Sequence, residues 1–362
     1  MNRREFIRLS ATSAAAGMTG CATQRAIEPW AKNEPLKALL LHLGHNMWCD
    51  WFPDDFDESA FAGLKRPDAE LRCREPQWRK VTDHAAAKGV NMIVIDIGEA
   101  LVYPSHPELA IKGSWSPDKM RGEVLRLRDM GIEAIPKLNF STTHNGWLKH
   151  YRRMLSTPTY YRVCEDLIAD VAEIFGRPRF MHIGFDEETA KHQDWDKSRY
   201  VHLVVRKGEF WWHDFLHIVR TVERNGMRPW AWSDYGWNNP DYYTRCPKSV
   251  LQSNWYYDES YGGFDLETNK TGDIKRLRAF WDLEKAGFDQ VPCGTNWVGW
   301  KRKAEKVGAD DVIGKLVAKC RKVISPEHLL GFMMAPWSPC SDDEHTQKNI
   351  SGIDLFAEAL KG

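Results

Sequence analysis

The stretch Lys37-Ala-Leu-Leu-Leu-His-Leu43 is a short apolar run bounded by Pro35 and Gly44. It does not alternate between apolar and polar residues, and this is the pattern of a strand that is buried on both faces of a sheet. Similar runs occur at residues 91–97, 132–138, 180–184, 228–232, 250–254, 290–293 and 330–335. The sequence therefore predicts eight buried strands.

Segments with helical periodicity lie between these strands. Tyr160, Val163, Leu167, Val171 and Ile174 are three or four residues apart, which places them on one face of a helix. Further helices are expected at residues 77–88, 118–130, 210–225, 273–286, 312–323 and 353–360, and the link after the fifth strand is expected to be mostly loop. Eight strands that alternate with helices, without a break in composition, predict an α/β fold of the (β/α)8 TIM-barrel type as a single domain.

The composition is that of a folded protein without a charge bias. The 362 residues contain 50 Lys and Arg against 50 Asp and Glu, which argues against a nucleic-acid partner because such proteins carry a basic surplus. No apolar run approaches 18 residues, which argues against a bundle of membrane-spanning helices. Tryptophan is frequent, with 17 residues, and it indicates either an aromatic core or a pocket with flat apolar walls.

In a TIM barrel, functional residues lie at the C-terminal ends of the strands and in the loops that follow. The last four predicted strands each lead to a tryptophan at this rim, and these are Trp232, Trp255, Trp297 and Trp337. A tryptophan that only fills the core need not recur at the same place on four strands. Because indoles are large and flat, with one polar N–H, they suit the C–H faces of sugar rings. The pattern favours a carbohydrate pocket.

The fourth strand is followed by two acidic residues, Asp186 and Glu187. Consecutive side chains at a strand end point in different directions, so one carboxyl can lie under a substrate while the other reaches its leaving group. Cleavage of a glycosidic bond commonly uses two carboxyl groups in this way. Adjacent acids are usually solvated surface groups, but the apolar run directly before this pair favours a catalytic role.

Other polar residues near strand ends are candidate substrate ligands, namely Asp96, His144, His182 and Asn296. The two histidines are expected to hydrogen-bond within the acid network and to tune its protonation. Neither a His-x-His motif nor a further His–Asp pattern completes a metal site, so no metal is expected.

The segment His182-Ile-Gly-Phe-Asp-Glu187 resembles the His-Ile-Gly-Gly-Asp-Glu motif of glycoside hydrolase family 20, the β-N-acetylhexosaminidases. The resemblance extends over residues 37–340 and therefore over the whole predicted barrel. Similar segments stand in the family's order at Tyr103-Pro104, Pro107-Glu-Leu109, Ser116-Pro-Asp118, 131–136, His144, Trp232 with Asp234, Gln252 with Trp255, and Trp337.

The resemblance implies a role for each acid. In the family, the Asp of the motif orients the 2-acetamido group of the substrate, whose carbonyl oxygen attacks the anomeric carbon. The Glu protonates the leaving oxygen and then activates water, with net retention. By resemblance, Asp186 would be the polarising residue and Glu187 the general acid/base, and Trp232, Trp255 and Trp337 would wall the pocket. No cofactor is implied, and the expected partner is a glycan or an amino-sugar oligosaccharide.

Some positions depart from the family's pattern. The first-strand arginine, which grips sugar hydroxyls, corresponds at best to Lys37, whose ammonium lacks the arginine fork. An acidic residue of the third strand aligns with Asn139, and Phe185 replaces a glycine. The Asp and Tyr of the seventh strand fall near Asn296 and Trp297. Acid chemistry is expected to be kept, whereas recognition of N-acetylglucosamine stays open.

The N-terminal residues predict export. Arg3 and Arg4 precede an Ala-rich stretch without acidic residues, as in a twin-arginine signal. We expect residues 1–20 to be the signal, 21–36 a linker and 37–362 the glycosidase-like catalytic domain, in the periplasm or cell envelope. Met18-Thr-Gly-Cys21 resembles a lipobox with an atypical Met. Lipidation of Cys21, which would anchor the chain without a spanning helix, stays open.

Seven cysteines follow Cys21, at positions 49, 73, 164, 246, 293, 320 and 340, and none belongs to a CxxC pair. A structural zinc cluster is therefore not supported. These residues are either buried apolar groups or, in an oxidising compartment, partners in one or two disulfides.

The favoured hypothesis is an exported glycoside hydrolase of the hexosaminidase type that acts on a terminal hexosamine or a related sugar. The alternatives are a surface lipoprotein that binds glycans without cleaving them, a glycosidase for a sugar without an acetamido group, and a metal-dependent hydrolase on the same barrel.

Overall fold

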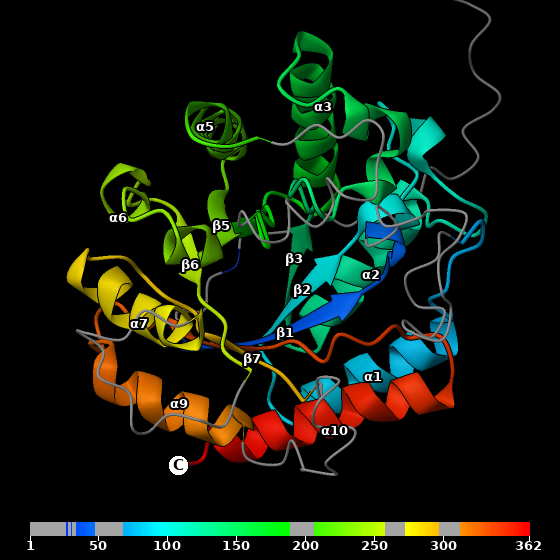
Figure 1. Cartoon of the computed structure of the whole chain (residues 1–362). Helices are drawn as coiled ribbons and strands as arrows, with labels where there is room; N and C mark the ends of the chain where they lie inside the picture. The colour runs from blue at the N-terminus through cyan, green and yellow to red at the C-terminus, as the bar shows by residue number, and fades with distance from the viewer. Residues whose placement is uncertain are drawn as a thin grey trace, which may run out of the picture.

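The computed structural model describes residues 27, 30, 34–47, 68–188, 206–257, 272–296 and 312–362. Eight parallel strands in this part of the chain form one curved sheet (Figure 1). The strands are β1 (Leu36–His42), β2 (Met92–Asp96), β3 (Glu133–Lys137), β4 (Phe180–His182), β5 (Arg228–Trp232), β6 (Leu251–Ser253), β7 (Cys293–Gly294) and β8 (Gly331–Met334).

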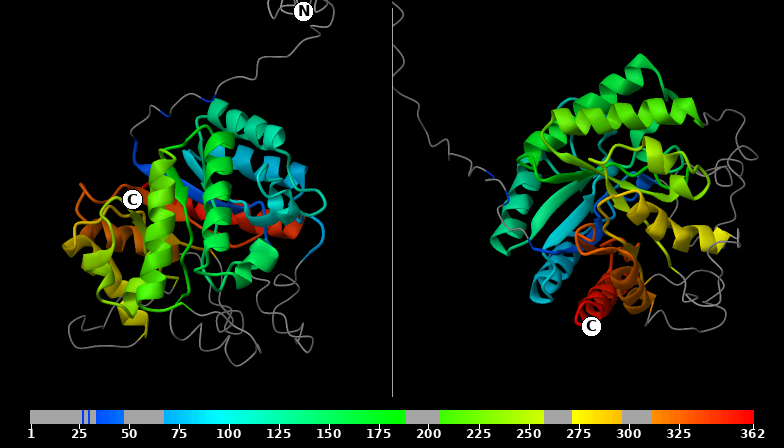
Figure 2. Two further views of the ribbon diagram at one scale, coloured as in Figure 1. Left: turned by 90° about the horizontal axis from the view of Figure 1, so that it is seen from above. Right: turned by 90° about the vertical axis from the view of Figure 1, so that its left-hand side faces the viewer.

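The sheet closes into a barrel. Its strand order is β6-β5-β4-β3-β2-β1-β8-β7, and the two ends of this order meet through parallel bridges between Gln252 and Gln290 and between Trp255 and Cys293. Figure 2 shows the strands inside a ring of helices. The predicted (β/α)8 barrel is confirmed.

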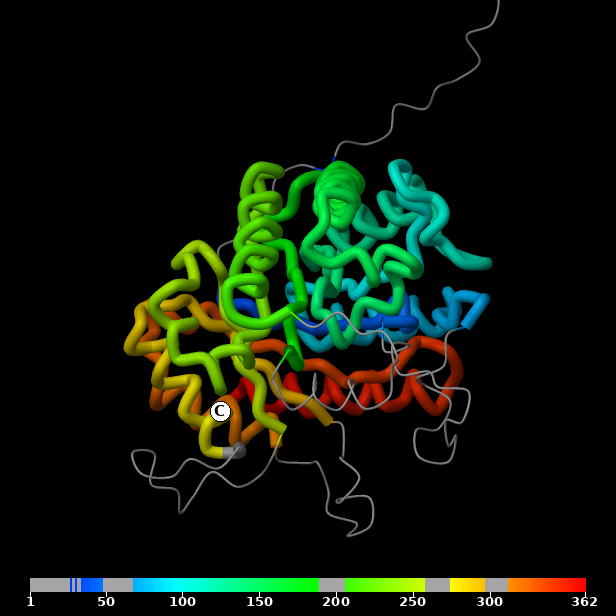
Figure 3. The backbone as a smooth tube through the Cα atoms, turned by 45° about the horizontal axis from the view of Figure 1, so that its top comes forward, coloured from blue at the N-terminus to red at the C-terminus, as the bar shows by residue number. Residues whose placement is uncertain are grey.

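The helices cover the outside of the barrel. They are α1 (Glu75–Ala87), α2 (Pro117–Asp129), α3 (Pro158–Ile174), α5 (Glu209–Arg224), α6 (Tyr242–Arg245), α7 (Gly272–Lys285), α9 (Val312–Val323) and α10 (Asp343–Ala359). Figures 1 and 3 show α10, in red, alongside α1, in light blue. None of the helices in the described residues combines the length and the hydropathy needed to cross a membrane.

Each strand has two buried faces, which explains the continuous apolar runs. In β1, Ala38 and Leu40 point into the barrel, where they pack with Val94 of β2. Leu39 and Leu41 point outward and belong to the larger core between the sheet and the helices. Successive side chains of a strand point to opposite faces, so a strand between two apolar layers has no position for a regularly repeated polar residue.

Two segments differ from the sequence prediction. The final helix was expected at residues 353–360 but begins ten residues earlier, where the Asp342 carboxylate accepts a hydrogen bond from the His345 backbone N–H. Its first turns are rich in charged residues, so they show no apolar periodicity. The link after β5, expected to be mostly loop, contains α6 and the short 3-10 helix η6 (Asp234–Trp237).

The seam between the last and first strands depends on Gly331. This residue pairs with Leu36 of β1 and has a φ of 146°. A Cβ at this position would lie 2.1 Å from the Leu36 carbonyl oxygen, so no side chain fits without separating the two strands.

We therefore expect Gly331→Ala to lower the free energy of unfolding by about 3–5 kcal/mol, because it combines a backbone clash with strain. Gly287, just after α7, is the matched control because it has a φ of 72° but open space around it. Gly287→Ala should lower the free energy by only about 1–2 kcal/mol, which is the left-handed penalty alone. Urea denaturation of both variants measures the difference, and equal losses would contradict this account of the seam.

Candidate active site

The acid pair leaves β4 through an unusual backbone conformation. Gly184, Phe185 and Glu187 all have positive φ angles, of 74°, 65° and 56°. Only glycine fits at 184, because a Cβ there would lie 2.1 Å from Asn139 Oδ1. The residues that follow β4 are therefore in close contact with the end of β3, and this contact positions Asp186 at the rim.

Phe185 stands where the resembling motif has glycine, although its φ of 65° suits glycine better. Its ring is buried in edge contact with Trp211 and Phe215 of α5, at centroid distances of 5.7 Å and 5.0 Å. The guanidinium of Arg206 lies 4.6 Å from the same ring. These contacts offset the strain of a left-handed phenylalanine.

Asp186 and Glu187 converge on one histidine. His144 Nε2 lies 2.8 Å from Glu187 Oε2, in a hydrogen bond, and 3.5 Å from Asp186 Oδ2. Asn139 donates a hydrogen bond of 2.8 Å from Nδ2 to Asp186 Oδ1. The Asp186 side chain is 13% exposed and that of Glu187 is 30% exposed. The structure thus brings three of the sequence-predicted site residues together, with Asp186 the deeper carboxyl.

A third carboxyl, Asp234, lies directly behind the pair and was not among the predicted site residues. Its Oδ2 accepts the Glu187 backbone N–H at 2.7 Å, and Trp255 Nε1 lies 3.5 Å from its Oδ1. Burial and the neighbouring Asp186 raise the pKa of Asp234 well above its usual value, because both disfavour the charged form of this carboxyl. The sequence feature that could have identified Asp234 is its position two residues after Trp232, at the end of the fifth predicted strand.

Aromatic side chains line the rim next to the acids. Trp232 contacts Trp337 at a centroid distance of 5.9 Å, and Trp255 stacks on Tyr257 at 5.0 Å. Trp337 and Tyr257 are partly exposed, whereas Trp232 is buried below them. Trp297 lies outside the described residues. Tyr257 is a further aromatic residue of the wall that was not among the predicted site residues. Its position two residues after Trp255 is the sequence feature that could have identified it.

Two predicted ligands, Asp96 and His182, are buried in the interior of the barrel. Lys137 Nζ donates to Asp96 Oδ2 at 2.5 Å, and His42 Nδ1 lies 3.3 Å from the same oxygen. Burial opposes ionisation of Asp96, but Lys137 and His42 outweigh it and hold the pKa of Asp96 below its usual value. Burial and Lys137 lower the pKa of His182, which keeps its imidazole neutral. Asp96 and His182 belong to a polar layer inside the barrel.

Lys37 and Asn296 are not brought to the acid pair. Lys37 is exposed at the start of β1, and the strand ends C-terminally at His42, so Lys37 lies at the opposite end of the barrel from the rim. Asn296 donates from Nδ2 to the Lys348 carbonyl of α10 at 2.8 Å, so its side chain faces the outer helix. The histidines near the rim on this side are His42, at the end of β1, and His45, in the segment that follows it.

A buried charged network supports the loop that carries His144. The Glu188 carboxylate accepts the Thr142 backbone N–H and an Arg206 N–H, each at 2.6 Å. Arg206 also pairs with Asp214 of α5 at 3.0 Å. The loop after β3 is thereby tied to the segment after β4, which keeps the His144 side chain next to the acid pair.

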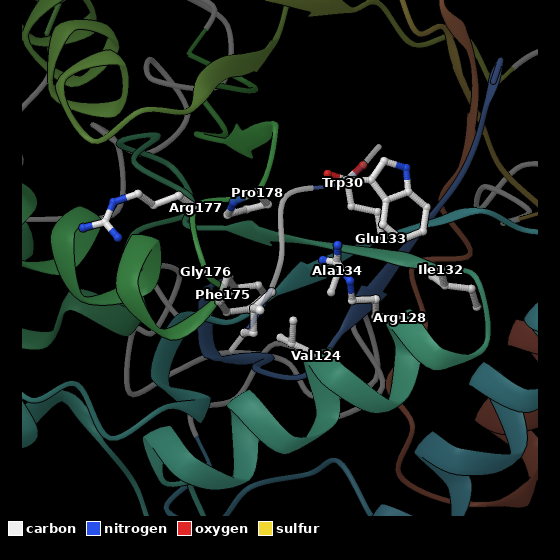
Figure 4. A pocket seen from close by; sticks show the side chains of 11 residues that line it. Trp30, Val124, Arg128, Ile132, Glu133, Ala134, Phe175, Gly176, Arg177 and Pro178 are labelled. Carbon is white, nitrogen blue, oxygen red and sulfur yellow. The ribbon is translucent and has the colours of Figure 1, made fainter. Parts of the chain in front are cut away.

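A small pocket lies at the other end of the barrel, between α2 and α3 (Figure 4). Trp30 and Arg128 are among its lining residues and contact each other, with the guanidinium 5.6 Å from the indole centroid. The pocket volume of about 20 Å³ is that of a single water site, so it is too small for a sugar. Among the described residues, no three or more His, Cys, Asp or Glu side chains are grouped to hold a metal ion.

Solved structures support the fold assignment. The β-N-acetylhexosaminidase from Bacteroides fragilis aligns with a TM-score of 0.57 and 12% identity, over 89% of this chain and 65% of that protein. Dispersin B aligns with a TM-score of 0.56 and 15% identity, over 91% of this chain and 99% of that protein. The exo-β-N-acetylglucosaminidase from Vibrio harveyi, solved with N-acetylglucosamine, aligns with a TM-score of 0.52 and 14% identity, over 91% of this chain and 57% of that protein.

This chain therefore spans less than two thirds of the Bacteroides and Vibrio proteins. No curated protein matches it significantly. The model of the glycosyl hydrolase family 20 catalytic domain matches residues 73–347, a stretch that contains α1 to β8 and every residue of the acid network. On this match, the chain belongs to glycosyl hydrolase family 20.

Proposed function

We propose that the protein is an exported glycoside hydrolase of the β-N-acetylhexosaminidase type, which removes a terminal hexosamine or a related sugar with retention of configuration. The observation that carries this proposal is the arrangement of Asp186 and Glu187 around His144. One carboxyl is deep and oriented by Asn139, and the other is more exposed. A substrate-assisted glycosidase needs one acid that orients the substrate and a second acid that transfers a proton to the leaving group.

Asp186 is suited to orient the acetamido group of a substrate. Asn139 holds one of its oxygens through a 2.8 Å hydrogen bond, which leaves the other oxygen, Oδ2, directed toward the His144 side of the site. A carboxylate in this position accepts the acetamido N–H and so aligns the acetamido oxygen with the anomeric carbon. No covalent bond to the enzyme is needed, because the substrate supplies its own nucleophile.

Glu187 is suited to be the general acid/base. Its carboxyl is the more exposed of the two and is hydrogen-bonded to His144, which is able to exchange a proton with it. In the first step Glu187 gives its proton to the leaving oxygen. In the second step it takes a proton from the water that opens the cyclised intermediate, which returns the site to its starting state.

Retention follows from the proposed route. The acetamido oxygen first displaces the leaving group, and water then opens the cyclised intermediate, so the anomeric carbon is inverted twice.

The proposed substrate class follows from the walls of the site. Partly exposed Trp337 and Tyr257 offer flat faces next to the acids, which suits the C–H faces of a sugar ring. We further propose that the twin-arginine pattern directs the protein to the periplasm or cell envelope, where glycan substrates are present. Residues 1–26 lie outside the described part of the chain.

We expect Glu187→Gln to lower hydrolysis of a nitrophenyl β-N-acetylglucosaminide by about a hundredfold to ten-thousandfold, because the amide can neither donate nor accept the transferred proton. Glu358→Gln, at the end of α10 and on the surface, is the matched control and should leave the rate unchanged. Steady-state assays over a panel of nitrophenyl glycosides measure the effect. Equal activity of Glu187→Gln and wild type would remove Glu187 from the mechanism.

A thiazoline that mimics the cyclised intermediate should inhibit the wild type competitively. Asp186→Asn should weaken this inhibition by about tenfold or more, because one hydrogen bond to a charged group is lost. Inhibition constants from steady-state kinetics test both statements. If the enzyme hydrolyses another glycoside and the thiazoline does not inhibit it, the substrate carries no acetamido group and substrate assistance is wrong. Tight sugar binding without turnover would indicate a binding protein instead.

The raised pKa of Asp234 predicts a pH dependence of stability. The pKa of an Asp carboxyl in the unfolded chain is about 3.9, and in the folded protein the pKa of Asp234 is higher. Below about pH 3.9 the proton on this carboxyl contributes fully to the stability of the fold. This contribution is lost as the pH rises from about 3.9 toward the folded pKa. Asn mimics the neutral form of Asp234, so Asp234→Asn should lose less stability than the wild type as the pH rises above about 4.

Urea denaturation at several pH values measures this difference. Asp234→Asn should also retain most activity, since its amide oxygen is able to accept the Glu187 N–H, whereas Asp234→Ala should not. Parallel stability curves for the wild type and Asp234→Asn would show that Asp234 is charged in the folded protein.

A further inference from the structure

Two buried cysteines are neighbours where the first and last units of the barrel adjoin. Cys73 lies just before α1, and Cys340 lies in the loop between β8 and α10. Both thiols are free in this structure, and Cys340 is the largest cause of the raised pKa of the Cys73 thiol. The two residues are 8% and 0% exposed, so both thiols are shielded from water.

The backbone holds the two cysteines side by side. The Arg74 N–H donates a hydrogen bond of 2.8 Å to the Cys340 carbonyl oxygen, which fixes one cysteine beside the other. Pro339 forms a parallel bridge with His42 of β1, and Asn349 Nδ2 lies 3.6 Å from Cys340 Sγ. The loop after β8 is therefore held at Pro339 and at Cys340 itself.

The other described cysteines have different surroundings. Cys164 lies beside Tyr160, and Cys293 lies beside Tyr257. Cys246 contacts Tyr242 and Gln252. Among the described cysteines with a raised pKa, Cys73 is the one on which another cysteine acts, and its neighbour Arg74 is hydrogen-bonded to that cysteine, Cys340. The sequence left the choice between buried thiols and disulfides open, and this proximity distinguishes one pair from the rest.

We propose that Cys73 and Cys340 form a disulfide that joins the first and last units of the barrel when the folded protein meets a disulfide oxidant. The oxidant is a small or protein disulfide. Cys73, the more exposed thiol, attacks it as the thiolate and releases one thiol of the oxidant. Cys340 then attacks the mixed disulfide and releases the second. Two thiols of the chain are oxidised and the oxidant leaves as two thiols, so atoms and electrons balance.

The surroundings of Cys73 set the rate of this exchange. The adjacent Cys340 thiol and burial raise the pKa of the Cys73 thiol, which lowers its thiolate fraction at neutral pH. Formation of the bond is therefore slow in the folded protein and becomes faster at alkaline pH. This inference does not depend on the proposed reaction, because neither cysteine touches the acid pair.

The bond would have two consequences. It would close a loop that contains most of the chain, which restricts the unfolded state and stabilises the folded one. It would also fix the loop after β8, in which Trp337 takes a φ of 52° and forms part of the aromatic wall. The cross-link thus connects a wall of the site to the outer helix α1.

The first experiment identifies the bond in the full-length wild-type protein. The protein is incubated at alkaline pH with oxidised glutathione or with dithiothreitol, denatured, alkylated and analysed by intact and peptide mass spectrometry. The oxidised sample should be lighter by two hydrogens before alkylation, with the peptides of Cys73 and Cys340 linked. Alkylation of both residues after oxidation would overturn the proposal, and so would a bond from either residue to another cysteine such as Cys49.

The second experiment measures its effect. The oxidised wild type should melt about 5–10 °C above the reduced protein. Cys73→Ala and Cys340→Ala should each lose this difference, whereas Cys320→Ala, which removes a buried thiol on α9, should keep it. A melting temperature that does not respond to reductant would overturn the proposal, as would loss of the difference in Cys320→Ala. Should Cys340→Ala fail to fold, the less buried Cys73→Ala and the mass measurement decide.

Discussion

The parallel closure of the barrel is the constraint on which the other features depend. Because all strands run in one direction, their C-terminal ends meet at a single rim, and residues far apart in the sequence become neighbours there. Asn139 from the end of β3, Asp186 from the end of β4 and Asp234 from the end of β5 are adjacent only for this reason. The closure also buries both faces of every strand, and charges inside the molecule must then be paired.

The buried charges follow this requirement. Lys137 and Asp96 pair inside the barrel, and Arg206 pairs with Glu188 and Asp214 beside the loop after β4. Removing one partner of such a pair leaves an uncompensated buried charge, which is more damaging than never having had the pair. The acid pair differs from these networks. Its carboxyls are partly exposed and lie near one shared imidazole, that of His144.

The barrel was predictable because doubly buried strands leave an apolar signature, and the acid pair because it directly follows such a strand. Side-chain direction was less accessible. Lys37 was assigned as the counterpart of the family's first-strand arginine, although it stands at the start of its predicted strand, the end opposite the rim. Asn296 was assigned without knowing which way its side chain points. Asp234 was missed because its role is a contact with a backbone N–H of another strand. The charged start of α10 was missed because capping, and not an apolar stripe, defines it.

Phe185 connects the acid pair to the outer layer of the protein. Where a glycine would tolerate the left-handed backbone by itself, this chain relies on Trp211 and Phe215 of α5 and on Arg206 to hold a bulky ring in the same conformation. Substitutions in these two regions are therefore expected to be energetically coupled. Replacing Phe185 by glycine would leave a void against α5, and loss of the α5 aromatic residues would remove the support of the left-handed backbone beside the acids.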